Sequence, residues 1–155
     1  MKDERLDLAF FSRVRDDALF QITAAFDLVP KTKSPNANEA RLRAAGEQAW
    51  VAAVTITQQA SRVFGLHLER DEHGKPCPPR RIRALHKVVA SMERRAGVPV
   101  GAWKEGLETA FQLHVHHYEG WVYSDRSAVL LAMAKVRAFV LVLDAQVHPR
   151  RVKRQ

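Results

Sequence analysis

The sequence predicts an all-α protein, built as an up-and-down bundle of four to five helices. Apolar residues recur at three- and four-residue spacing in five separate blocks, which is the period of an amphipathic helix. The segments between these blocks are short and rich in proline, glycine or polar residues, and short connections favour antiparallel neighbours. We expect no strands.

The first two helices are predicted over residues 4–29 and from residue 37 or 38 to about 66. The first has one apolar face, and Pro30 with the polar run behind it ends the helix. The second has two apolar stripes, which predicts a central helix packed on two sides, and its small residues allow a neighbour to approach closely. Gly65 is expected to end it.

The other three helices are predicted over residues 80–96, 101–122 and from a cap at Ser124 or Asp125 to 147. Residues 69–79 contain three prolines and are expected to form a loop. Residues 1–147 would form one domain, and residues 148–155 a flexible basic tail. We expect the core to include Trp50, Trp103, Trp121, Leu85, Phe111, Val140 and Leu141.

The net charge of +8 is concentrated in two segments. Residues 80–95 hold six basic residues and one acid, Glu93, and the last six residues carry four more positive charges. Such segments attract RNA, other polyanions or an acidic partner, although a solvated helix face with a solubilising tail is an equal alternative. The candidate nucleic-acid-binding residues are Arg80, Arg81, Arg83, Lys87, Arg94, Arg95, Arg150, Arg151, Lys153 and Arg154.

A polar cluster of Glu47, His114, His117, Tyr118 and Glu119 is the second candidate site. His114 and His117 are three residues apart on one side of a helix, and such a pair holds a transition metal if a third ligand joins it. The interpretation that we favour is a buried, neutral His114 hydrogen-bonded to a carbonyl, to Glu47 or to Glu119. His116 falls on the polar side, where we expect it to be solvated.

Arg81 and His86 form a third constellation. On one helix, a histidine that moves a proton and an arginine that stabilises an anionic transition state would serve phosphoryl chemistry. The alternative, a solvated or phosphate-attracting helix face, is the one we favour.

Several classes of protein are disfavoured by what the sequence lacks. It has no P-loop, no Gly-x-Gly-x-x-Gly motif and no cysteine pair, so we expect no cofactor and no dedicated metal site. No apolar run is long enough for a membrane span. A single cysteine, Cys77, and a start charged with both signs favour a cytoplasmic location.

Three segments resemble the HEPN-like superfamily. Residues 44–53, Ala-Ala-Gly-Glu-Gln-Ala-Trp-Val-Ala-Ala, resemble the second-helix signature of small HEPN-type proteins. Leu113-His114 with Tyr118-Glu119 resembles the Leu-His…Phe-Tyr-Glu segment of the archaeal paralogous-repeat branch, although His117 replaces the usual Phe. Ser124-Asp125 and residues 136–140 resemble the last helix of that branch.

The resemblance implies a helical bundle that forms a homodimer and binds nucleotides or RNA. Many members of the superfamily are metal-independent endoribonucleases of toxin–antitoxin or defence systems, which would add an antitoxin partner. Their Arg-x4–6-His motif usually lies near the last helices, whereas here Arg81 and His86 match its spacing on the third. We therefore prefer a binding protein for RNA or another polyanion, with an RNase toxin and a metal-binding bundle as alternatives.

Overall fold

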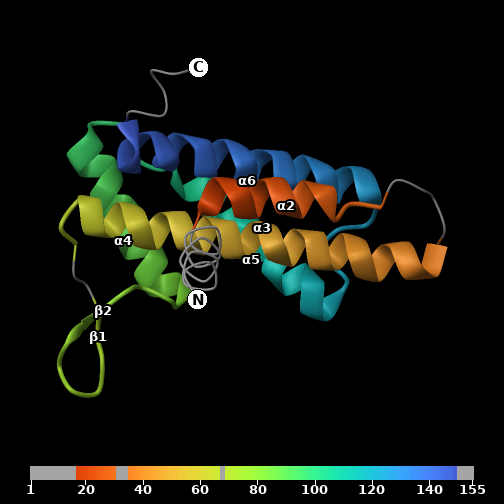
Figure 1. The fold of residues 1–155 in the computed structure, drawn as a ribbon, viewed down its shortest axis with the longest axis horizontal. Coiled ribbons are helices and arrows are strands. Elements are labelled where there is room, and N and C mark those ends of the chain that lie inside the picture. Colours follow the sequence, from red (N-terminus) through yellow and green to blue (C-terminus); the bar gives the residue numbers. More distant parts are fainter. Residues whose placement is uncertain (1–16, 31–34, 67–68, 150–155) are drawn as a thin grey trace, which may run out of the picture.

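The computed structural model describes residues 17–30, 35–66 and 69–149, and the helices in these ranges form one bundle (Figure 1). The helices α2, α3 and α6 run alongside one another, α5 packs against α3 and α6, and α4 crosses one end. This confirms the predicted all-α, up-and-down fold. The helix bounds are Ala18–Asp27 (α2), Pro35–Val63 (α3), Ile82–Ala96 (α4), Lys104–Glu119 (α5) and Arg126–Val147 (α6).

The central position predicted for the second helix is confirmed, because α3 packs against each of the other four helices. Five of its alanines are fully buried, and their small side chains allow the neighbouring helices to approach. Gly46 shows how close this packing is: a Cβ placed there would lie 3.2 Å from Leu113 Cδ2 of α5. The helix ends at Val63, three residues before the predicted end, and Gly65 follows with a φ of +68°.

A single helix over residues 4–29 is wrong, because the backbone is extended at Asp17. This residue has φ −94° and ψ 108°, and its carboxylate accepts hydrogen bonds from the backbone N–H groups of Leu19 and Phe20. Asp17 is therefore the N-cap of α2. The predicted helical residues 4–16 lie outside the described part of the chain.

The predicted loop at residues 69–79 contains a short antiparallel ladder, contrary to our expectation of no strands. Glu69–Arg70 (β1) pairs with Pro76–Cys77 (β2). Asp71 closes the turn between them, since its carboxylate accepts from the backbone N–H groups of His73 and Lys75. The loop is thus a small hairpin that projects beside α4 (Figure 1).

The remaining helices lie where the sequence predicts them, but α5 is shorter at both ends than the predicted 101–122, since it runs from Lys104 to Glu119. Gly97 and Gly120 end α4 and α5 with positive φ, and Asp125 caps α6 through a 2.8 Å bond from Ala128 N–H. Since α5 ends at Glu119, Trp121 lies outside it and is 72% exposed, so its assignment to the core is wrong. Leu141, on the outer side of α6, is also exposed rather than buried.

No helix in the described ranges has the length and apolar character that crossing a membrane requires. Of the expected basic tail, His148 and Pro149 are described, and residues 150–155 lie outside the described part of the chain.

Candidate functional site

The first candidate site is the outer surface of α4 and the residues that lead into it. All the cations that the sequence singled out here are exposed, and we call them together the basic face: Arg80, Arg81, Arg83, Lys87, Arg94 and Arg95. The opposite side of α4 is apolar and fully buried through Leu85, Val88, Val89 and Met92. The helical period therefore separates the apolar and cationic residues to opposite sides of the helix.

Glu93, the single acid of residues 80–95, faces the protein interior and is only 2% exposed. Its carboxylate accepts hydrogen bonds from the backbone N–H groups of Gly101, Trp103 and Lys104, at 3.1, 2.7 and 3.2 Å. These bonds hold the turn between α4 and α5. They also remove the one negative charge of this segment from the surface, so the basic face has no acid of its own.

Few of the cations on the basic face are engaged within the protein. Arg94 donates to Ser91 Oγ at 3.1 Å, and Arg95 donates to the backbone carbonyl of Phe64. No carboxylate of the described residues lies within ion-pairing distance of the six side chains. Arg83, Lys87 and Arg94 recur on one stripe of the helix, which spans about 16 Å at 1.5 Å per residue.

Arg81 and His86 both belong to this region, but no hydrogen bond joins them in the described structure. Arg81 is the exposed N-cap residue of α4 and provides no side-chain cap. His86 is half-buried one turn later, and its Nδ1 is buried without a hydrogen-bond partner. The remaining predicted contacts, Arg150, Arg151, Lys153 and Arg154, lie outside the described residues.

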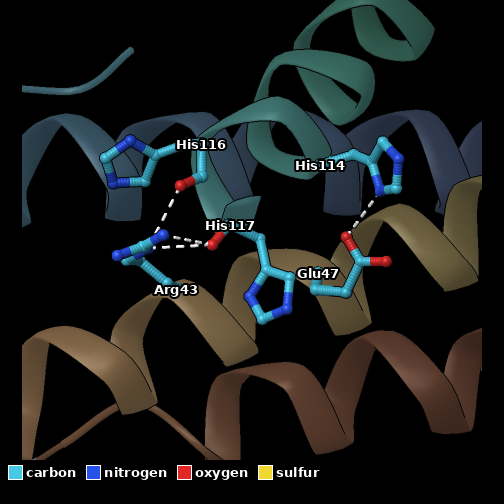
Figure 2. A network of polar contacts seen from close by, with 5 residues as sticks. All are labelled: Arg43, Glu47, His114, His116 and His117. Atoms are coloured by element: carbon cyan, nitrogen blue, oxygen red, sulfur yellow. Dashed lines mark hydrogen bonds and ion pairs between the residues drawn. The ribbon is translucent and has the colours of Figure 1, made fainter. Parts of the chain in front are cut away.

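The second candidate site lies between α3 and α5, where Glu47 meets His114 (Figure 2). His114 Nδ1 is 2.7 Å from Glu47 Oε2, and the two side chains are 31% and 23% exposed. Of the partners considered for His114, Glu47 is thus the observed one, although the imidazole is partly exposed rather than buried. A carboxylate only accepts, so this contact selects the tautomer with the proton on Nδ1.

Aromatic rings surround the His114 imidazole, with centroids of Trp50, Phe111 and Tyr118 at 5.2, 6.1 and 5.2 Å. Among the described residues, none forms a hydrogen bond with the Nε2 of His114. The carboxylate on Nδ1 fixes the orientation of the imidazole. The arrangement also ties α3 to α5, as a structural histidine would.

The described residues provide no third ligand for a metal ion bound by His114 and His117. No group of three or more His, Cys, Asp or Glu side chains converges among the described residues. The ring centroids of His117 and Tyr118 are 4.8 Å apart. In the described structure the Nδ1 of His117 is buried without a hydrogen-bond partner. Tyr118 and Glu119 are exposed at the end of α5.

Arg43 of α3 is the member of this cluster that sequence reasoning missed. Its Nε donates to the backbone carbonyls of His116 and His117 at 3.1 and 3.0 Å, and its Nη2 also donates to the latter (Figure 2). Both carbonyls belong to the last turn of α5, where helix carbonyls run out of N–H partners, and that of His116 also accepts the N–H of Gly120. A cation at a helix C-terminus also complements the helix dipole. Only the packing of α3 on α5 reveals this role.

We expected His116 to be solvated, and this is wrong, because the residue is only 5% exposed. Its Nδ1 accepts a hydrogen bond from the backbone N–H of Tyr123 at 3.2 Å, and the two rings lie edge to face at 5.3 Å. Burial, and then the positive charge of Arg43, lower the pKa of His116, while Glu39 opposes this shift. The chain turns back over the end of α5 here, which brings Tyr123 onto the side of the helix that looked polar.

Comparison with known proteins found no matching family model, curated relative or solved structure.

Proposed function

We propose that this protein is a HEPN-like helical bundle that binds RNA or another polyanion through the basic face. The observation that carries the proposal is that six cations of residues 80–95 are exposed while Glu93, their one acid, is buried. A surface with one sign of charge raises the local concentration of ligands of the opposite sign. Arginine also suits phosphate, because its planar guanidinium donates two parallel hydrogen bonds.

The start of α4 adds to the affinity for an anion. Arg81, the N-cap residue, provides no side-chain acceptor for the first N–H groups of the helix. These groups and the helix dipole favour a negative charge. Arg80, Arg81 and Arg83 are exposed around this helix end. A phosphate backbone would follow the surface from the start of α4 toward Arg94.

The experiment is a titration of fluorescent single-stranded RNA at several salt concentrations, with Arg83, Lys87 and Arg94 replaced together by glutamine. Each phosphate contact that is lost removes one released counterion, so log Kd should depend less steeply on log salt, by about 0.7 per contact for single strands. We expect the triple variant to bind at least about tenfold more weakly at low salt, on the same counterion argument.

The matched control replaces Arg41, Arg62 and Arg137, three exposed arginines on α3 and α6, by glutamine. This control changes the net charge equally and should keep most of the affinity. Equal weakening by both variants, or an affinity that does not change with salt, would contradict the basic face as the binding site.

A homodimer is part of the same proposal, and the outer side of α6 supports it. Leu131, Leu141 and Val142 are exposed there, together with Ala134 and Ala138. A twofold axis would bury the same side of two copies against each other. Light scattering should give twice the chain mass, and Leu131→Glu with Leu141→Glu should give the monomer. A monomeric wild type at micromolar concentration would contradict this part.

RNA cleavage with Arg81 and His86 is the second candidate, favoured by the position of His86 within the helix that carries the basic face. The unpaired, buried Nδ1 leaves Nε2 as the atom through which His86 would exchange a proton. Expression of the wild type should then arrest growth, and His86→Ala should restore it while RNA binding persists. Equal growth with both chains would exclude this candidate and leave the binding proposal intact.

A further inference from the structure

We infer that His116 is a proton-sensitive latch that holds residues 120–125, the junction between α5 and α6, against the bundle. The junction has no helix or strand and carries the exposed Trp121. The side chain of His116 contacts the junction, and its backbone carbonyl contacts Arg43 of α3. This inference is independent of polyanion binding.

The side chain of His116 holds the junction itself. Nδ1 accepts the backbone N–H of Tyr123, so the neutral ring carries its proton on Nε2. The ring also packs edge to face on the Tyr123 ring, whose hydroxyl donates to Gln112 Oε1 of α5 at 3.4 Å. One imidazole thus provides both the polar and the aromatic contact that place Tyr123.

The backbone of the same residue connects the latch to α3. The carbonyl of His116 accepts the N–H of Gly120 at 2.8 Å, which ends α5, and the Nε–H of Arg43 at 3.1 Å. A displacement of His116 would therefore disturb the end of α5, the junction and the contact with α3 together.

Protonation is incompatible with this geometry. A proton on Nδ1 would point at the Tyr123 N–H, so two donors would face each other in a buried site. The charges that act on the imidazole come from α3: Arg43 opposes a second positive charge and the exposed Glu39 favours it. Tyr123 is neutral at acidic and neutral pH, since burial raises its pKa. Proton uptake therefore requires the junction to open.

Low pH should favour the open junction. The pKa of His116 is lowered in the folded protein, so the opened junction binds the proton more tightly than the closed one. The latch is fully closed above the ordinary histidine pKa of about 6.5. Below it, the opening constant should rise about tenfold per pH unit until the lowered pKa is reached.

The test is amide hydrogen exchange of Tyr123 between pH 7.5 and 5.0, corrected for the intrinsic exchange rate, in the full chain. We expect protection in the wild type to fall as the pH drops below about 6.5, with a slope of at most about tenfold per pH unit that ends at the lowered pKa of His116. His116→Asn keeps an acceptor, Oδ1, where Nδ1 lies but does not titrate, so its protection should not change with pH. His117→Asn, beside it in sequence, is the matched control and should behave as the wild type.

Constant protection across this range, or a dependence that persists in His116→Asn, would overturn the inference. If His116→Asn does not fold, an NMR titration of the imidazoles in the wild type decides the question. A midpoint below 6.5 with the proton on Nε2 supports the latch, and a midpoint at or above 6.5, or the proton on Nδ1, refutes it.

Discussion

The helices α4 and α5 both carry many titratable residues, but the structure uses them in opposite ways. In α4 the cations face solvent and only Glu93 is buried, where it fixes the turn to α5. Near the end of α5 two histidines contact neighbouring segments, His116 against Tyr123 and His114 against Glu47 of α3. The difference teaches that the cations of α4 leave a charged surface facing solvent, whereas the histidines of α5 hold neighbouring segments together.

The largest effect expected at a titratable residue comes from the one residue of α4 that behaves like those of α5. Glu93→Ala leaves three backbone N–H groups without their acceptor in a largely buried turn. We expect the free energy of unfolding to fall by about 3 kcal/mol, as for other lost buried bonds to a charged group. Urea denaturation measures it, and Glu108→Ala, an exposed acid of α5, is the control. Similar small losses in both variants would break the comparison.

A smaller effect is expected at the end of α5. Arg43→Ala removes the guanidinium that binds the carbonyls of His116 and His117. The free energy of unfolding should fall by about 1.5 kcal/mol, the scale of a hydrogen bond from a charged donor. Arg41→Ala changes an exposed arginine two residues away. It should lower the free energy of unfolding by less than about 0.5 kcal/mol. Thermal or urea unfolding of both variants separates a capping role from a simple loss of charge.

The smallest effect sharpens the boundary between the core and the junction. Trp121→Ala removes an exposed ring and should change the free energy of unfolding by less than about 0.5 kcal/mol. Trp103→Ala, the matched change at a buried position, should cost about 3–5 kcal/mol because it leaves a cavity. Equal losses in urea denaturation would show that Trp121 belongs to the core after all.

The sequence predicted the helices well wherever an apolar stripe was uninterrupted. Leu85, Val88, Val89 and Met92 recur with the helical period and are all fully buried in α4. The first helix was predicted too long because Asp17, which lies within an amphipathic pattern, adopts an extended conformation and caps α2. A short polar side chain that bonds backbone N–H groups competes with helix continuation, and periodicity alone does not reveal which outcome is realised.

The basic face could be predicted from residue types, but its freedom from acid could not. Glu93 counts as a surface charge in any inventory of the sequence, and only the turn to α5 brings three N–H groups to it. The pair of His114 and Glu47 was among the predicted alternatives because both lie on strongly patterned helices. Arg43 and the buried position of His116 were missed, since the first depends on the packing of α3 on α5 and the second on how the chain folds back at the end of α5.

By itself, the sequence determined the helical class, the central position of α3 and the outward placement of the cations of α4. Each of these follows from the helical period of 3.6 residues, which places residues three and four apart on the same side of a helix and so depends only on neighbours in the sequence. Only the tertiary structure decided that Glu93 and His116 are buried and that Glu47 contacts His114. Those contacts join segments from different helices and turns, and their pairing depends on the path of the whole chain.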